Sequence, residues 1–156
     1  GALAAGIGVL FAARGVGTGI GPVVARALFK DQERWPFLLG ACIVFSGVCY
    51  LMVGLVPWVL VVVFGLIVLA HASSGANWVM ATVLLQKRTE DRFRGRVFAT
   101  EWLLVMLADT VSILVASVLL EAAFIDLRLS FLVFALIQIV SGLLWIAVVV
   151  PRERVG

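Results

Sequence analysis

The chain has 156 residues, of which 63% are hydrophobic and 13% are charged, and its mean hydropathy is +1.19. A typical soluble domain is about 45–50% apolar with glycine included and about 25% charged. These values exclude a disordered chain, a coiled coil and a collagen-like chain. They also argue against a soluble globule, because a small domain must cover its core with polar surface. The composition predicts an integral membrane protein. Because the chain starts at Gly1, directly in apolar sequence, we expect it to be part of a longer protein.

Charged clusters divide the chain into five long apolar stretches. Each reaches the roughly 20 residues that a helix needs to cross a hydrocarbon core, and backbone groups in lipid must be paired within their own segment. We therefore predict an all-α, polytopic membrane bundle of five transmembrane helices, at about residues 3–26, 36–55, 58–86, 97–121 and 130–150. Pro36 is expected to open the second helix, Pro57 to mark the next turn and Pro151 to end the last helix. The long third stretch is expected to tilt, project beyond the membrane or bend at 73–75.

The basic residues predict the orientation of these helices. Ten of the 12 Lys and Arg residues lie in the first loop, the third loop and the C-terminal tail: Arg26, Lys30, Arg34, Lys87, Arg88, Arg92, Arg94, Arg96, Arg152 and Arg154. The opposite loops contain only Arg128. The positive-inside rule places the ten on the cytoplasmic side, so the C-terminus is expected inside and the N-terminus outside. The net charge of +3 is thus a topology signal, and no basic stripe or aromatic platform indicates nucleic acid as a partner.

A few polar groups lie inside the predicted spans. Arg14, His71 and Asp109 lie at similar depth in the first, third and fourth spans, and Gln138 lies near the middle of the fifth. Glu101 is about one turn inside the fourth span, and the second span has no charge. A charged Arg, Lys or Asp at this depth costs about 2.5–3.5 kcal/mol on insertion scales, so such residues are candidates for function.

Two interpretations of these groups remain open. In the first, helices one, three and four line a polar cavity at the membrane midplane, where Arg14 pairs with Asp109 or either residue binds substrate or a proton. In the second, Arg14 and Asp109 form a static pair that fixes helix packing. His71 either titrates or is a packed core histidine. Glu101 is expected to pair with a nearby arginine, namely Arg92, Arg94 or Arg96.

The first span contains two overlapping GxxxG pairs, Gly15 with Gly19 and Gly17 with Gly21. This spacing gives a flat face on which another helix can approach closely. The same face is compatible with sliding or bending during a transport cycle. No G-x-G-x-x-G follows a strand, so a nucleotide fingerprint is excluded.

The segment from His71 to Asn77 includes Ser73 and Ser74, which raises the possibility of an intramembrane hydrolase. No nucleophile–base–oxyanion constellation accompanies them, and we predict no enzyme activity. These residues are expected instead at a helix interface or a pore. One histidine and two cysteines at lipid depth make no convincing metal site, and we expect neither a metal nor a cofactor.

Two segments resemble the major facilitator superfamily. Residues 21–30 resemble a degraded copy of its loop signature, in which Gly21, Arg26 and Lys30 match and Ala25 replaces the acidic residue. Residues 84–98 are similar to a stretch between helices ten and eleven of the drug, macrolide and siderophore efflux branch. The matching residues there are Leu84-Leu85-Gln86, Asp91 and Arg94-Gly95-Arg96-Val97.

This resemblance implies that the whole chain, 1–156, is a partial C-terminal bundle, helices eight to twelve of a twelve-helix fold. In that family helices eight, ten and eleven border the central cavity, and these are the spans that contain Arg14, His71 and Asp109. Helix seven and the N-terminal bundle of the same chain would be missing partners. The implied setting is a bacterial-type plasma membrane, in which the chain is multi-pass with a cytoplasmic C-terminus.

The resemblance further implies a secondary active transporter, with proton-coupled efflux of small molecules by alternating access. The substrate and proton pathway would contain Arg14, Asp109, His71, Asn77 and Gln138, with Asp109 as the protonation switch. A cytoplasmic gate would contain Gly21, Arg26, Lys30, Arg94, Gly95 and Arg96, although these residues fit equally a role in topology and lipid headgroup contact alone. The alternatives are a lipid or nutrient carrier, a sensor of the same fold, and a non-transporting membrane scaffold with static charge pairs.

Overall fold

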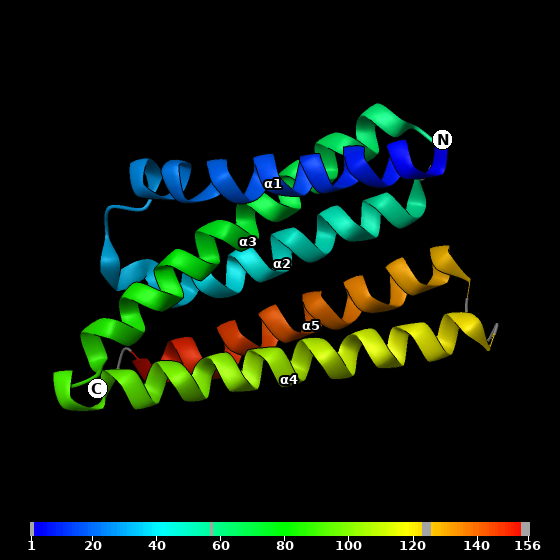
Figure 1. The fold of residues 1–156 in the computed structure, drawn as a ribbon. Coiled ribbons are helices and arrows are strands. Elements are labelled where there is room, and N and C mark those ends of the chain that lie inside the picture. Colours follow the sequence, from blue (N-terminus) through cyan, green and yellow to red (C-terminus); the bar gives the residue numbers. More distant parts are fainter. Residues whose placement is uncertain (1, 57, 123–125, 154–156) are drawn as a thin grey trace.

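The computed structural model describes residues 2–56, 58–122 and 126–153, and within these ranges it is helical with no strand (Figure 1). The helices are α1 (Ala2–Leu28), α2 (Trp35–Leu55), α3 (Leu60–Arg88), α4 (Arg94–Glu121) and α5 (Leu127–Glu153). Short 3-10 turns, η1 (Gln32–Arg34) and η2 (Asp91–Phe93), precede α2 and α4. All five α-helices are long and apolar enough to cross a membrane. The predicted all-α class and the five long helices are therefore confirmed, with boundaries within about three residues of those expected.

Local sequence accounts for most helix ends. Asp31 caps η1, because its side-chain oxygen accepts a hydrogen bond from the Glu33 backbone N–H at 3.1 Å. Pro36 lies in the first turn of α2 as predicted, where its missing N–H has no intrahelical partner to lose. The turn predicted at Pro57 lies outside the described residues. Helix α3 continues through residues 73–75 without interruption.

The prediction for Pro151 is wrong, because this residue lies inside α5, which continues to Glu153. A proline in the last turn removes one hydrogen bond but leaves the remaining residues free to keep helical dihedrals. The Glu153 side chain also binds Arg88 at the end of α3, and this contact holds the end of α5 in place.

The helices alternate in direction, so their charged ends gather at one end of the bundle. Figure 1 shows that α1, α3 and α5 end there and that α2 and α4 begin there. The two basic loops and Arg152 at the end of α5 therefore lie at the same end of the bundle, as the sequence predicted. At the opposite end, Arg128 Nε donates to the Gly54 carbonyl at 3.0 Å, and the Arg128 guanidinium lies 5.9 Å from the Trp58 ring centre.

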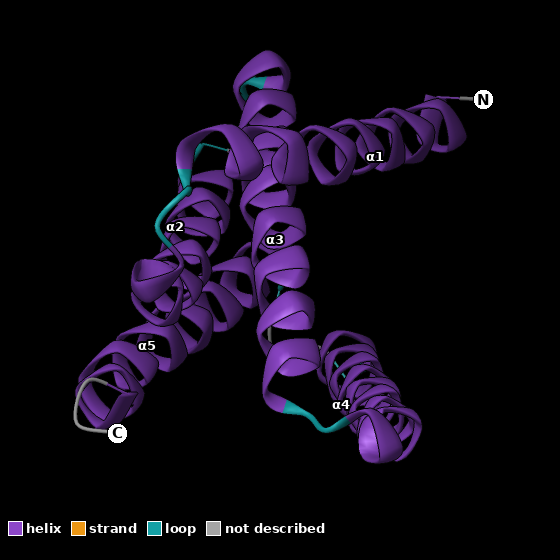
Figure 2. Ribbon diagram, turned by 90° about the vertical axis from the view of Figure 1, so that its left-hand side faces the viewer, coloured by secondary structure: helices purple, strands orange, loops and turns teal. Residues whose placement is uncertain are grey.

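Three interfaces form the packed part of the bundle, namely α1 on α3, α3 on α2 and α2 on α5. Helix α4 is peripheral, and none of its residues is buried. It reaches α3 through Trp78 and Trp102, whose ring centres are 5.4 Å apart in an edge-to-face arrangement. In Figure 2, α1 extends to one side from its contact with α3, and α4 lies apart from α2 and α5.

The α1–α3 interface depends on one of the two predicted GxxxG pairs. A Cβ on Gly17 would lie 2.9 Å from His71 Cβ, and one on Gly21 would lie 2.9 Å from Ala72 Cα. On the facing helix, a Cβ on Gly75 would lie 2.8 Å from the Thr18 carbonyl oxygen. Gly15 and Gly19 face open space. The predicted close approach is therefore confirmed for Gly17 and Gly21 alone.

A second glycine interface joins α2 to α5. Gly40, Gly47 and Gly54 recur every seven residues along α2 and face α5, where Gly142 is in close contact with Gly40. A Cβ on Gly47 would lie 3.1 Å from the Ala135 carbonyl oxygen, and one on Gly142 would lie 2.9 Å from the Gly40 carbonyl oxygen. This repeat, which was not predicted from the sequence, brings two backbones together along most of their length.

Candidate functional site

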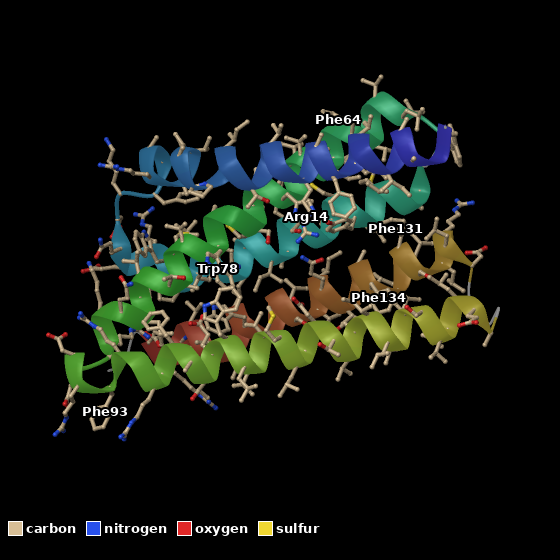
Figure 3. All side chains as sticks on the ribbon, viewed as in Figure 1. Arg14, Phe64, Trp78, Phe93, Phe131 and Phe134 are labelled. Carbon is tan, nitrogen blue, oxygen red and sulfur yellow. The ribbon has the colours of Figure 1, made fainter. Side chains whose placement is uncertain are left out.

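Three polar side chains from three helices gather in the middle of the bundle, and we call Arg14, Tyr50 and His71 the polar centre. The Tyr50 hydroxyl and His71 Nε2 are hydrogen-bonded at 2.9 Å, and their rings meet edge to face. In Figure 3 the Arg14 side chain extends from α1 toward the middle of the bundle. Helices α1, α2 and α3 thus each contribute one member.

Tyr50 was not among the residues that the sequence singled out. It is the single tyrosine of the chain and lies in a span without charge. A phenol hydroxyl in such a span needs a hydrogen-bond partner, and this requirement could have indicated from the sequence that Tyr50 binds another polar side chain. Tyr50 also stacks on Phe131 of α5, with ring centres 6.3 Å apart.

Gln138 is close to the polar centre. This half-buried residue lines a mainly apolar pocket of 290 Å³ between α2 and α5, and Tyr50 lines the same pocket. Phe131 and Phe134 form part of its wall (Figure 3), and Ala116 of α4 closes one side. Tyr50 is therefore hydrogen-bonded to one predicted pathway residue, His71, and lines a pocket together with another, Gln138.

Ser73 and Asn77 lie at a helix interface. Ser73 Oγ donates to the Cys42 carbonyl at 2.8 Å, and Asn77 Nδ2 donates to the Leu39 carbonyl at 3.0 Å. Both bonds connect α3 to the backbone of α2. The sequence left open whether these residues lie at a helix interface or in a pore. Because both side-chain donors bind the backbone of a neighbouring helix, they lie at an interface. Trp145 of α5 makes a similar bond to the Pro36 carbonyl at 2.7 Å.

Neither Asp109 nor Glu101 of helix α4 takes part in an ion pair in the described part of the chain. Asp109 is exposed, and within the described ranges no ion pair joins it to Arg14 at 4.0 Å or less. The expected pairing of Glu101 with a nearby arginine is also not formed. Arg92 pairs with Glu90 at 2.8 Å and Arg94 pairs with Asp91 at 3.0 Å, because these acids are adjacent in the tight turn before α4.

The predicted gate residues divide into two groups. Gly21 contacts α3, and the adjacent Ala25 is 5% exposed in a cluster with Leu39 and Met80. An acidic side chain at position 25 would lie in this apolar cluster, which explains physically why alanine suits the position. Arg26 and Lys30 line a groove of 590 Å³ between α1, α3 and the loop before α2. At the start of α4, Arg96 is exposed and Gly95 faces open space.

The basic end contains a connection that the sequence did not reveal. Arg88 Nη1 donates to Glu153 Oε1 at 2.8 Å, and Arg88 Nη2 donates to Glu153 Oε2. The Arg88 hydrogen bonds lower the pKa of Glu153 below its usual value of 4.5. Both residues lie beyond the apolar stretches 58–86 and 130–150. Lys87 Nζ also donates to Gln32 Oε1, so the end of α3 is connected to both α5 and η1.

No family model, curated protein or solved structure matches this chain.

Proposed function

We propose that the chain forms part of a secondary active membrane transporter that exports small molecules in exchange for protons by alternating access. The observation that carries this proposal is the polar centre, in which Tyr50 and His71 are hydrogen-bonded across two helices and Arg14 extends toward the middle of the bundle from a third (Figure 3). Ionisable residues inside membrane helices are costly and commonly mark substrate, ion or proton pathways. The chain would supply helices eight to twelve of a major-facilitator-like fold.

Two features support a moving site over a fixed one. The polar centre lies beside the close crossing of α1 and α3, where small residues permit sliding of one helix on the other. A pocket of 290 Å³ containing Gln138 is next to Tyr50. Movement of Arg14 relative to His71 or Asp109 would change how readily each holds a proton, because a nearby positive charge opposes protonation. In this proposal Asp109 and His71 are the proton-binding groups.

The proposal also includes orientation. The ends of the helices at which ten basic residues are concentrated would face the cytoplasm, and the chain would be multi-pass in a bacterial-type plasma membrane. Arg94 and Arg96 would lie where a cytoplasmic gate closes. For Arg26 and Lys30 the second role that the sequence left open, contact with lipid headgroups, is taken up below.

The test is proton-driven export by the full-length protein in proteoliposomes. With an imposed pH gradient and ethidium as the probe, Asp109→Asn and His71→Gln should each reduce coupled export at least tenfold. The matched control is Glu121→Gln, which removes an exposed acid at the far end of the same helix and should leave export unchanged. Unaltered coupling in Asp109→Asn would eliminate Asp109 as the switch. Absence of gradient-driven export with ethidium and other amphiphilic cations would count against an exporter.

A second candidate function is a non-transporting membrane scaffold. The observation that favours it is the set of interhelical hydrogen bonds to main-chain carbonyls from Ser73, Asn77 and Trp145, which is typical of static packing. Sided labelling separates the two functions. A transporter predicts that Arg14→Cys and Asp109→Cys react with a membrane-impermeant maleimide from one side at a time. A scaffold predicts that both stay unreactive from either side.

A further inference from the structure

We propose that the groove lined by Arg26 and Lys30 is a binding site for one anionic phospholipid. This basic groove lies at the charged end of the bundle, between the last turns of α1, the inner half of α3 and the loop before α2. Its volume of 590 Å³ is in the range of small-molecule sites. The inference concerns lipid recognition and does not depend on transport.

The polarity of the basic groove matches that of an amphiphile. Arg26, Lys30 and Gln32 line it near the charged end of the bundle, and we call these three residues the rim. None of the described residues that line the groove is acidic. Val23, Val79 and Val83 line its walls further along α1 and α3. Cations therefore lie at the water-facing end of an apolar channel, which is the order of headgroup and acyl chain in a phospholipid. Free phosphate would use only the rim, so the apolar walls favour a lipid.

The rim cations are available for such a ligand. Within the described ranges, neither Arg26 nor Lys30 takes part in an ion pair, whereas Arg34, Arg88, Arg92 and Arg94 do. Lys87 adds a third cation near the rim, because its ammonium group binds the side chain of Gln32. Basic pockets between transmembrane helices are a known setting for anionic lipid headgroups.

The floor of the basic groove is held in a defined shape. Trp35 lines it and donates its indole N–H to the Phe29 carbonyl at 3.0 Å, which fixes the loop that contains Lys30. Met80 is 2% exposed and anchors the groove to the buried cluster. Tryptophan at this depth is typical of the membrane interface. A hydrogen bond and buried packing therefore fix part of the lining beside Lys30.

The experiment titrates the purified full chain, in a neutral detergent, with dioleoyl-phosphatidylglycerol, and measures bound lipid by native mass spectrometry. We expect one high-affinity lipid, with phosphatidylcholine binding more weakly. A basic residue near an anionic lipid contributes about fivefold in affinity, so Arg26→Gln with Lys30→Gln should weaken binding about 25-fold. The charge-preserving pair Arg26→Lys with Lys30→Arg should retain it. Val79→Trp, which narrows the channel and keeps the charges, should weaken binding at least fivefold.

The matched control removes two other cations from the same end, Arg92→Gln with Arg152→Gln, neither of which lines the groove. We expect this control to change affinity less than twofold. An equal loss in the control would show diffuse surface attraction and overturn the proposal. Full affinity in Val79→Trp would show that no acyl chain enters the groove and would overturn it too. Displacement of the lipid by excess inorganic phosphate or glycerol phosphate would make this a phosphate site and refute the lipid assignment.

Discussion

The two GxxxG pairs of α1 provide a matched comparison for the α1–α3 interface. In Gly21→Ala the new methyl group would meet the Ala72 backbone, with Cα 2.9 Å away, so no flexible side chain can yield and the helices must separate. In Gly19→Ala the same methyl group, two residues away on the same helix, would meet nothing within 4 Å.

The expected magnitudes follow from these contacts. Overpacking costs about 1–3 kcal/mol, and a collision with backbone belongs at the upper end of that range. Alanine in place of glycine inside a helix otherwise favours folding by about 0.5–1 kcal/mol. We therefore expect Gly21→Ala to lower the free energy of unfolding by about 1–2 kcal/mol net, and Gly19→Ala to leave it unchanged or raise it slightly.

The assay is reversible unfolding in mixed micelles titrated with sodium dodecyl sulfate, followed by circular dichroism and by the proximity of labels on α1 and α3. Gly17→Ala should behave like Gly21→Ala, and Gly15→Ala like Gly19→Ala. Equal effects from both pairs would refute the reasoning, because glycine would then matter through helix propensity and not through the α1–α3 contact. A larger loss of stability in Gly19→Ala than in Gly21→Ala would place α3 on the face of α1 that contains Gly15 and Gly19.

Three further predictions concern the other interfaces. A double-mutant cycle of Tyr50→Phe and His71→Ala, measured by the same unfolding titration, should give a coupling energy of about 0.6 kcal/mol and at most about 1.7 kcal/mol. Zero coupling would mean that the Tyr50–His71 hydrogen bond is absent in the membrane. Gly47→Ala should destabilise the protein and Gly65→Ala should not, because only Gly47 faces another helix, where an added Cβ would lie 3.1 Å from the Ala135 carbonyl oxygen. Similar unfolding curves for the two variants would contradict the α2–α5 contact. Because the pKa of Glu153 is lowered in the folded state, its ion pair with Arg88 stabilises the fold above pH 4.5. This contribution is lost as the pH falls through the lower, folded-state pKa. A series of unfolding titrations at different pH should therefore show a destabilisation in acid that Glu153→Gln lacks.

The five helices could be predicted because length and hydropathy alone determine which segments can cross a bilayer. Their ends were harder to place. Pro151 indicated a helix end, yet α5 continues to Glu153, because a proline in the last turn removes only one hydrogen bond and the carboxylate binds Arg88. The basic end was predictable because antiparallel helices with short connections must bring alternate loops together.

The contacts could not be predicted in the same way. Gly15 and Gly17 are two residues apart, so they lie on nearly opposite faces of α1, and both faces have GxxxG spacing. Only the position of α3 decides which face is used. Tyr50 was missed because its role depends on His71, 21 residues away on another helix. The Arg14–Asp109 pair, one of the arrangements left open by the sequence, is not among the ion pairs of the described residues. Similar depth in two helices does not fix how those helices face each other.

The distribution of hydrogen bonds indicates which helix can move. Side chains of α3 bind the α2 backbone through Ser73 and Asn77, and α5 binds α2 through Trp145, so relative motion of these three helices breaks polar bonds. Within the described residues, no hydrogen bond joins α1 to α3, and their contact at Gly17 and Gly21 is van der Waals packing. Sliding of α1 therefore costs dispersion contacts but no polar bond, and it carries Arg14 past the fixed Tyr50–His71 pair. Of the helices at the polar centre, α1 is the one whose displacement changes the electrostatics without dismantling the bundle.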